Sequence, residues 1–136
     1  MLILSVDRMQ LFKLDLMPIQ SDPEEGEGVN LRLEAGPVFG ERLVLDSNNL
    51  YLTGEHDELA ELIEGLVAVA EGRPAFSFNP AERNLRLIAF RREAHVTLEL
   101  SVPDVTPDLV WVVEAQELRR FAQGLQLESQ QLGFHL

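Results

Sequence analysis

The chain has 136 residues, 46% of them hydrophobic and 25% charged, which suits one folded domain with a real core and argues against wholesale disorder. It contains no cysteine, which excludes disulfide bonds, thiolate nucleophiles and cysteine-bound zinc. Its formal net charge of −12 disfavours binding to nucleic acid or to an anionic membrane surface, so we expect neither partner.

The first part of the chain predicts strands joined by loops. The apolar start at residues 2–6 lacks the basic flank of a signal peptide, so we interpret it as a strand. Residues 12–16 and 29–34 alternate apolar and polar side chains, as half-buried strands do. Residues 21–28 combine turn formers with carboxylates and predict an acidic loop.

A hairpin and a helix are predicted next. Residues 43–45 and 50–52 flank four turn-forming residues, which predicts that these two strands pair with each other. Thr53 or Gly54 can cap the helix that follows, and Gly72 ends it. Apolar residues recur inside it at steps of three and four, which predicts a stripe facing the core. This stripe consists of Leu59, Leu62, Ile63, Leu66, Val69 and Ala70.

The second half of the chain predicts four strands and another helix. The strands span about residues 75–78, 85–90, 96–102 and 109–113, and the helix runs from Glu114 or Ala115 to about residue 130. Residues 109–113 are apolar on both alternations, so we expect this strand at the centre of a sheet, with Trp111 in the core.

These elements predict one α+β domain over residues 1–136. Neighbouring strands are joined by short turns rather than by helical crossovers, so the sheet should be mainly antiparallel. The two helices are both amphipathic, and we expect them to pack on one face of that sheet. No apolar stretch approaches the roughly 18 residues that a membrane-spanning helix needs.

The sequence offers no catalytic or cofactor motif. The three histidines, His56, His95 and His135, have no second histidine or carboxylate at metal-ligand spacing, so we expect neither a metal nor another cofactor. Gly26 and Gly28 lack the lysine and the following helix of a phosphate-binding loop. No serine occupies a strand-to-helix elbow. We therefore expect no enzymatic activity.

A small basic cluster spans a predicted hairpin of this acidic chain. It consists of Arg83, Arg86, Arg91 and Arg92. We expect these guanidinium groups to pair with nearby carboxylates on an exposed face rather than to bind phosphate, because no exposed aromatic residue interleaves with them.

Negative charge is concentrated in the first half of the chain. The first 72 positions hold 15 acidic and four basic residues, a net charge of −11, whereas positions 73–136 carry a net charge of only −1. A field of one sign steers partners of the opposite sign. The asymmetry therefore predicts a basic partner.

The first helix is the best candidate for such a contact. Asp57, Glu61, Glu64 and Glu71 are spaced to lie along one solvent-facing stripe, and no basic residue occurs between Glu55 and Glu71. The candidate partner-binding residues are Glu55, Asp57, Glu58, Glu61, Glu64 and Glu71. Two interpretations remain open: the acidic side of the helix is a solvent-exposed surface that serves solubility alone, or it is a docking surface for a basic partner.

The pattern of elements from about residue 29 to 132 resembles the WapI-like immunity proteins of bacterial polymorphic toxin systems. The likeness rests on residues 50–53 followed by the helix at 57–63, then on residues 76–80, 84–87, 96–102 and 117–121. The resemblance implies a small cytoplasmic α+β protein without enzymatic activity that binds and blocks a cognate toxin. A nuclease toxin would suit the charge of this chain, because a nuclease is itself basic where it holds phosphates.

Two further hypotheses stay open beside the binding protein. One is a small enzyme or ligand-binding domain of unknown substrate, with a deep pocket that His95 or Trp111 would line beside buried carboxylates. The other is a self-assembling subunit such as a homodimer, formed through an exposed strand edge or through the apolar tail of Leu132, Phe134 and Leu136.

Overall fold

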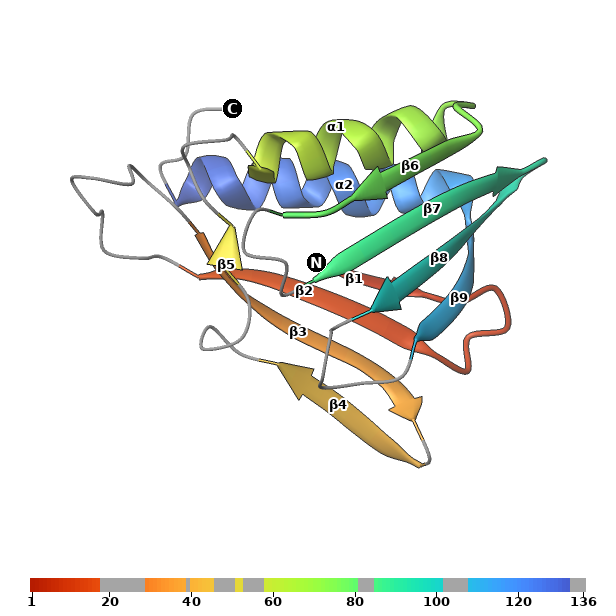
Figure 1. The fold of residues 1–136 in the computed structure, drawn as a ribbon, viewed down its shortest axis with the longest axis horizontal. Helices are drawn as coiled ribbons and strands as arrows, with labels where there is room; N and C mark the ends of the chain where they lie inside the picture. The colour runs from red at the N-terminus through yellow and green to blue at the C-terminus, as the bar shows by residue number, and fades with distance from the viewer. Residues whose placement is uncertain are drawn as a thin grey trace.

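The computed structural model describes residues 1–17, 29–38, 40–45, 51–52, 58–80, 85–101 and 108–132. The predicted acidic loop at 21–28, the predicted helix cap at Thr53 or Gly54 and the tail beyond residue 132 lie outside these ranges. Within them, the chain folds into two antiparallel sheets and two helices (Figure 1). The predicted α+β class with mainly antiparallel pairing is confirmed, but the strands form two sheets rather than one.

The sheets follow the order of the chain. The first contains β1 (Leu2–Leu4), β2 (Leu11–Met17), β3 (Val29–Val38), β4 (Glu41–Leu45) and β5 (Tyr51–Leu52). The second contains β6 (Ala75–Phe78), β7 (Arg86–Arg92), β8 (His95–Ser101) and β9 (Leu109–Glu114), in that spatial order. Each sheet is thus built from consecutive segments, which short turns can connect.

The predicted hairpin between residues 43–45 and 50–52 is wrong. Both β4 and β5 pair with β3 instead, β4 through Leu33↔Leu45 and β5 through Asn30↔Tyr51. Continuous pairing would place residue 48, not Tyr51, opposite Asn30, so the chain inserts three extra residues between the two short strands. Strands β4 and β5 both run antiparallel to β3, because the ten-residue β3 offers room for both segments.

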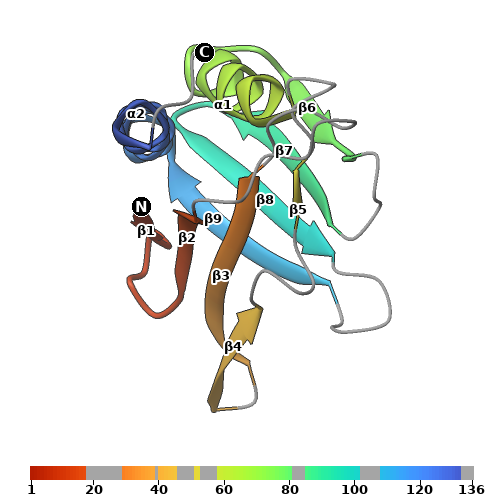
Figure 2. The same cartoon turned by 90° about the vertical axis from the view of Figure 1, so that its left-hand side faces the viewer.

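The helices α1 (Glu58–Ala70) and α2 (Ala115–Gln131) pack against each other. They run side by side along the top of Figure 1, and Figure 2 views them end-on. Helix α1 contacts β6 and β7, whereas α2 contacts β1 and β2 of the first sheet as well as β8 and β9 of the second. The expectation that both helices cover one face of a single sheet is therefore replaced by a helix pair in which α2 contacts both sheets.

The end of α1 agrees with the prediction. Gly72 has a φ of +128°, and the Arg73 N–H donates to the carbonyl oxygen of Ala68 at 2.9 Å while the Gly72 N–H donates to that of Val69 at 3.1 Å. These two bonds form a Schellman motif, in which the residue after the helix adopts a left-handed conformation that glycine tolerates.

The core lies between the sheets and beneath the helices. Alternating strand residues point inward and are buried, as in β2, where Phe12, Leu14 and Leu16 are at most 4% exposed. The Phe12 ring centroid lies 5.3 Å from that of Trp111 and 5.6 Å from that of Phe121, so one side chain joins both sheets and α2. Trp111 is therefore a core residue, as predicted.

Strand β9 does not occupy the central position predicted for residues 109–113. It forms an edge of the second sheet, and Val110 and Val112 are 48% and 44% exposed. The Val6 N–H donates to the carbonyl oxygen of Val112 at 2.8 Å, so the segment after β1 joins this edge to the first sheet. Strand β9 therefore has apolar side chains on both faces: one face lies in the core, and the other is exposed to solvent.

Candidate functional site

The acidic face predicted on the first helix is partly present. Glu61 and Glu64 are exposed on α1, three residues apart and hence neighbours on the helix surface. Neither carboxylate takes part in a hydrogen bond or ion pair within the part of the chain that the structure describes. Glu55 and Asp57 precede α1 and lie outside the described residues.

Glu58 does not belong to the exposed face. Its side chain is 3% exposed, because residue 58 precedes Leu62, Gly65 and Val69 by four, seven and eleven positions and so shares their buried side of the helix. The predicted set placed it beside the acidic stripe, but in the structure it lies at the buried start of α1.

Glu71 is exposed but has a cationic neighbour. The Nη2 atom of Arg119, on α2, lies 3.5 Å from Oε1 of Glu71, and both side chains are 52% exposed. An ion pair this exposed contributes little stability, but it neutralises part of the predicted stripe. Among the described candidate residues, Glu61 and Glu64 remain as an exposed acidic surface, which we call the α1 acidic pair.

The α1 acidic pair can bind cations through its geometry. Carboxylates spaced three residues apart on a helix lie about 5–6 Å apart at Cβ, within reach of a single guanidinium or of two ammonium groups. Helix α1 has no basic residue in its last turn, so its own sequence does not screen this charge. The arrangement offers no nucleophile and no general acid or base with a defined partner.

The arginine cluster behaves differently from its prediction. Arg91 has no ion pair with a described carboxylate. Its Nη1 donates to the carbonyl oxygens of Ala70 at 2.6 Å and Val69 at 3.2 Å, and its Nε donates to that of Glu93. A guanidinium at the negative end of a helix is favourable. Arg86 and Arg92 are exposed without an ion pair among the described residues, and Arg83 lies outside them.

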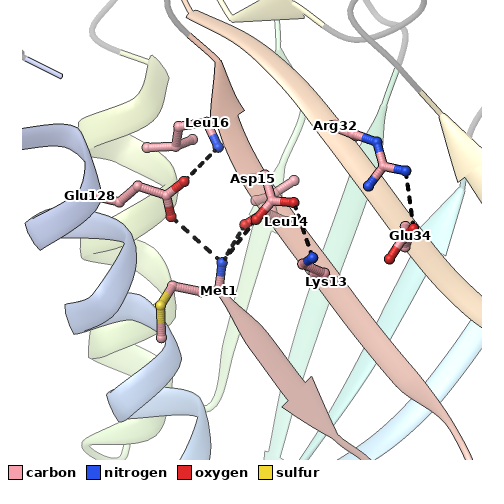
Figure 3. Close-up of polar contacts among 8 residues, drawn as sticks. All are labelled: Met1, Lys13, Leu14, Asp15, Leu16, Arg32, Glu34 and Glu128. Atoms are coloured by element: carbon pink, nitrogen blue, oxygen red, sulfur yellow. Dashed lines mark hydrogen bonds and ion pairs between the residues drawn. The ribbon is translucent and has the colours of Figure 1, made fainter. Parts of the chain in front are cut away.

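Another charged cluster was not anticipated from the sequence (Figure 3). The ammonium nitrogen of Met1 donates to the carbonyl oxygen of Leu14 at 2.6 Å and lies 3.5 Å from carboxylate oxygens of both Asp15 and Glu128. The other Glu128 oxygen accepts a bond from the Leu16 N–H at 3.0 Å. No local pattern could reveal this cluster, because Leu16 and Glu128 are 112 positions apart. The carboxylates of Asp15 and Glu128 already contact the Met1 ammonium group, so they are not available to a partner.

No metal centre is found where the structure describes the chain. His95 is exposed at the start of β8, while His56 and His135 fall outside the described residues. The described residues contain no group of three histidines or carboxylates that could hold a metal ion. Neither described helix is long and apolar enough to cross a membrane.

One described hollow, of about 230 Å³, lies between β1 and the start of α2. It is lined by Leu2, Ile3, Leu4, Ser5, Val6, Arg8, Glu114 and Glu117. Neither His95 nor Trp111 lines it, and its Glu117 is already 2.6 Å from Nη1 of Arg120. It therefore differs from the deep pocket that the ligand-binding hypothesis requires.

Beside this hollow, Asp7 organises a tight turn. Its Oδ1 accepts bonds from the Ser5 hydroxyl at 2.5 Å and from the Met9 N–H at 2.9 Å. These bonds, that of Ser5 first, lower the pKa of the Asp7 carboxyl. Arg8 has a φ of 60° in this turn, so the carboxylate holds a left-handed residue in place.

Comparisons with known proteins do not assign the chain to a family. No family model matches it, and no curated protein matches it significantly.

Proposed function

We propose that this chain is a non-catalytic binding protein whose α1 acidic pair contacts a basic protein partner. The exposure of Glu61 and Glu64 without an ion pair in the described part of the chain carries this proposal. Like charges three or four residues apart cost a helix a few tenths of a kcal/mol, which a cationic partner would recover.

The partner class follows from charge. With a net charge of −12 the chain would be steered toward a basic surface, and a nuclease that holds phosphates has such a surface. Its blockade by an acidic protein would be an immunity function of the kind that the WapI-like resemblance implies, in the bacterial cytoplasm. The lack of a metal-ligand group in the described residues is compatible with this role but does not argue for it.

The test is affinity capture from the native host with Glu61→Lys, Glu64→Lys and the double variant. Glu41→Lys, at an exposed position of β4, reverses a charge away from α1 and is the control for a single substitution. We expect one basic protein to bind both the natural chain and the Glu41→Lys variant at low salt and to be released from them at high salt. The same protein should bind the double variant at least tenfold more weakly.

Thermal stability separates a surface effect from unfolding. Both α1 positions are exposed, so the double variant should melt within a few degrees of the natural chain. A double variant that keeps full affinity and full salt dependence while remaining folded would overturn the α1 acidic pair as the contact.

A further inference from the structure

The outer face of the second sheet carries exposed apolar side chains. Its centre contains Ile88 and Phe90 on β7 and Val110 and Val112 on β9, with the polar residues Thr97 and Glu99 of β8 between them. Phe90 is 43% exposed and Val110 and Val112 are nearly half exposed. The other face of this sheet faces the core, so α1 does not cover this one: Phe76, which contacts Gly65 of α1, aligns with buried Ala89.

Charged residues flank this centre in a regular way. Along β7 the outward positions read Arg86, Ile88, Phe90, Arg92, which is basic, apolar, apolar, basic. Along β9 and the residue before it they read Asp108, Val110, Val112, Glu114, which is acidic, apolar, apolar, acidic. The β7 and β9 rows of this face therefore have the same pattern with opposite charge.

The two rows form no ion pair with each other among the described residues of one chain. Strand β8 lies between β7 and β9, and Arg92 and Glu114 both align with His95 on it. Two strand spacings separate their backbones by roughly 10 Å. No ion pair involves Arg86, Arg92, Asp108 or Glu114 among the residues that the structure describes.

The outer face of the first sheet shows the contrast. There Lys13 lies 3.6 Å from Asp15, and Arg32 lies 3.1 Å from Glu34, so the charges pair within the face itself (Figure 3). In the second sheet the basic residues lie on β7 and the acidic residues at the ends of β9, each pair enclosing two apolar side chains, while β8 between them presents the polar residues Thr97 and Glu99. That arrangement suits a partner surface with the reverse order.

We propose that the partner is a second copy of this chain and that the outer face of the second sheet is a two-fold dimer interface. A two-fold axis along β8 places β7 of each copy over β9 of the other. Arg92 then meets Glu114 of the other copy, and Arg86 meets its Asp108. Phe90 and Ile88 face Val112 and Val110 of the other copy, so the four ion pairs lie at the ends of two apolar rows, and the polar side chains of β8 lie between these rows on the axis. The dimer leaves the α1 acidic pair free and is independent of the proposed function.

The size of the face sets the strength of the dimer. Three strands, each about 5 Å wide, and seven residues along each strand give a patch of roughly 15 by 23 Å, below the ~800 Å² per partner of a standard interface. We therefore expect a reversible dimer with a dissociation constant in the micromolar range, rather than an obligate one. Burial of Phe90 should supply most of its apolar contribution.

Sedimentation equilibrium of the 136-residue chain from about 1 to 500 μM tests the dimer directly. We expect a monomer–dimer equilibrium at about 0.15 M salt, where the repulsion between two chains of net charge −12 is screened. Phe90→Lys should weaken it at least tenfold, whereas Val44→Lys, at an exposed apolar position of β4, should not. A natural chain that stays monomeric over the whole range would overturn the proposal.

Charge reversal tests the geometry. Arg92→Glu and Glu114→Arg each place like charges in contact in a dimer of the single variant, so each alone should dimerise roughly tenfold or more weakly. Mixing the two variants restores both opposite-charge contacts, so a heterodimer of about natural affinity should form. Circular dichroism confirms that each variant is folded. Two folded variants that fail to associate when mixed would overturn the two-fold arrangement.

The axis itself makes one further prediction. Glu99 lies on β8 and therefore faces Glu99 of the other copy, which opposes association. Glu99→Gln should tighten the dimer severalfold, whereas an interface away from this face would give no change. Unchanged affinity in Glu99→Gln would therefore overturn the axis along β8.

Discussion

Phe76 of β6 covers Gly65 of α1 so closely that a Cβ atom built on the glycine would lie 2.2 Å from the phenylalanine ring. The absence of a side chain at position 65 therefore allows α1 to approach the second sheet. Glycine inside a helix costs about 1 kcal/mol relative to alanine, so the contact with Phe76 must offset that cost. This close approach fixes the position of the helix that carries the α1 acidic pair.

Gly65→Ala should consequently have opposite effects in two backgrounds. In the natural chain we expect it to lower the free energy of unfolding by about 1 kcal/mol, because overpacking of 1–3 kcal/mol exceeds the gain in helix propensity. In a Phe76→Ala background the ring is absent, so the same substitution should raise stability by up to about 1 kcal/mol. Urea denaturation of the four chains measures the coupling, and equal effects in both backgrounds would contradict it.

Arg91 should stabilise α1 through the helix carbonyls that it contacts. Arg91→Ala removes the bonds to Val69 and Ala70 and should lower the free energy of unfolding by about 1.5–3 kcal/mol. Arg91→Lys should restore part of this loss, because an ammonium keeps the charge but not the branched geometry. Arg42→Ala, at an exposed arginine of β4, is the control and should change stability by less than about 0.5 kcal/mol. If urea denaturation showed an equal loss in both alanine variants, the bonds from Arg91 to the helix carbonyls would not stabilise α1.

The Asp7 turn predicts a pH dependence with a definite sign. Because hydrogen bonds from Ser5 and Met9 lower the folded-state pKa of Asp7, its ionised form stabilises the fold above the unfolded-state pKa. This contribution should disappear as pH falls through the lower, folded-state pKa. Asp7→Asn should therefore be less stable than the natural chain at pH 7, and the difference should close in acid. NMR titration of the Asp7 carboxyl carbon measures the shift, and an ordinary or raised pKa would contradict it.

Local patterns in the sequence were enough to predict the helices and most strands, but not how distant segments meet. The apolar stripes of α1 and α2 and the alternation of β8 identify these elements because each pattern repeats within the element itself. The pairing of β4 and β5 with β3 depends on an insertion that no alternation reveals.

The candidate site was predicted less well for the same reason. Helical spacing placed Glu61 and Glu64 on the exposed side of α1 correctly. It could have placed Glu58 on the buried side too, since residue 58 shares the periodicity of Leu62 and Val69. The contact of Glu71 with Arg119 joins two helices 48 positions apart, so only the packing of α1 on α2 reveals it.

Glu128 should contribute to stability by two separable routes. One carboxylate oxygen accepts the Leu16 N–H at 3.0 Å, and the other lies 3.5 Å from the Met1 ammonium (Figure 3). Glu128→Ala removes both contacts and should lower the free energy of unfolding by about 2 kcal/mol, because it leaves a strand N–H unsatisfied. Glu128→Gln keeps an oxygen acceptor and loses only the charge, so about half of the stability should return. In urea denaturation the loss in Glu128→Gln should shrink as salt screens the ammonium in the natural chain, whereas most of the loss in Glu128→Ala should persist. Equal losses in the two variants at every salt concentration would mean that the bond to Leu16 adds nothing.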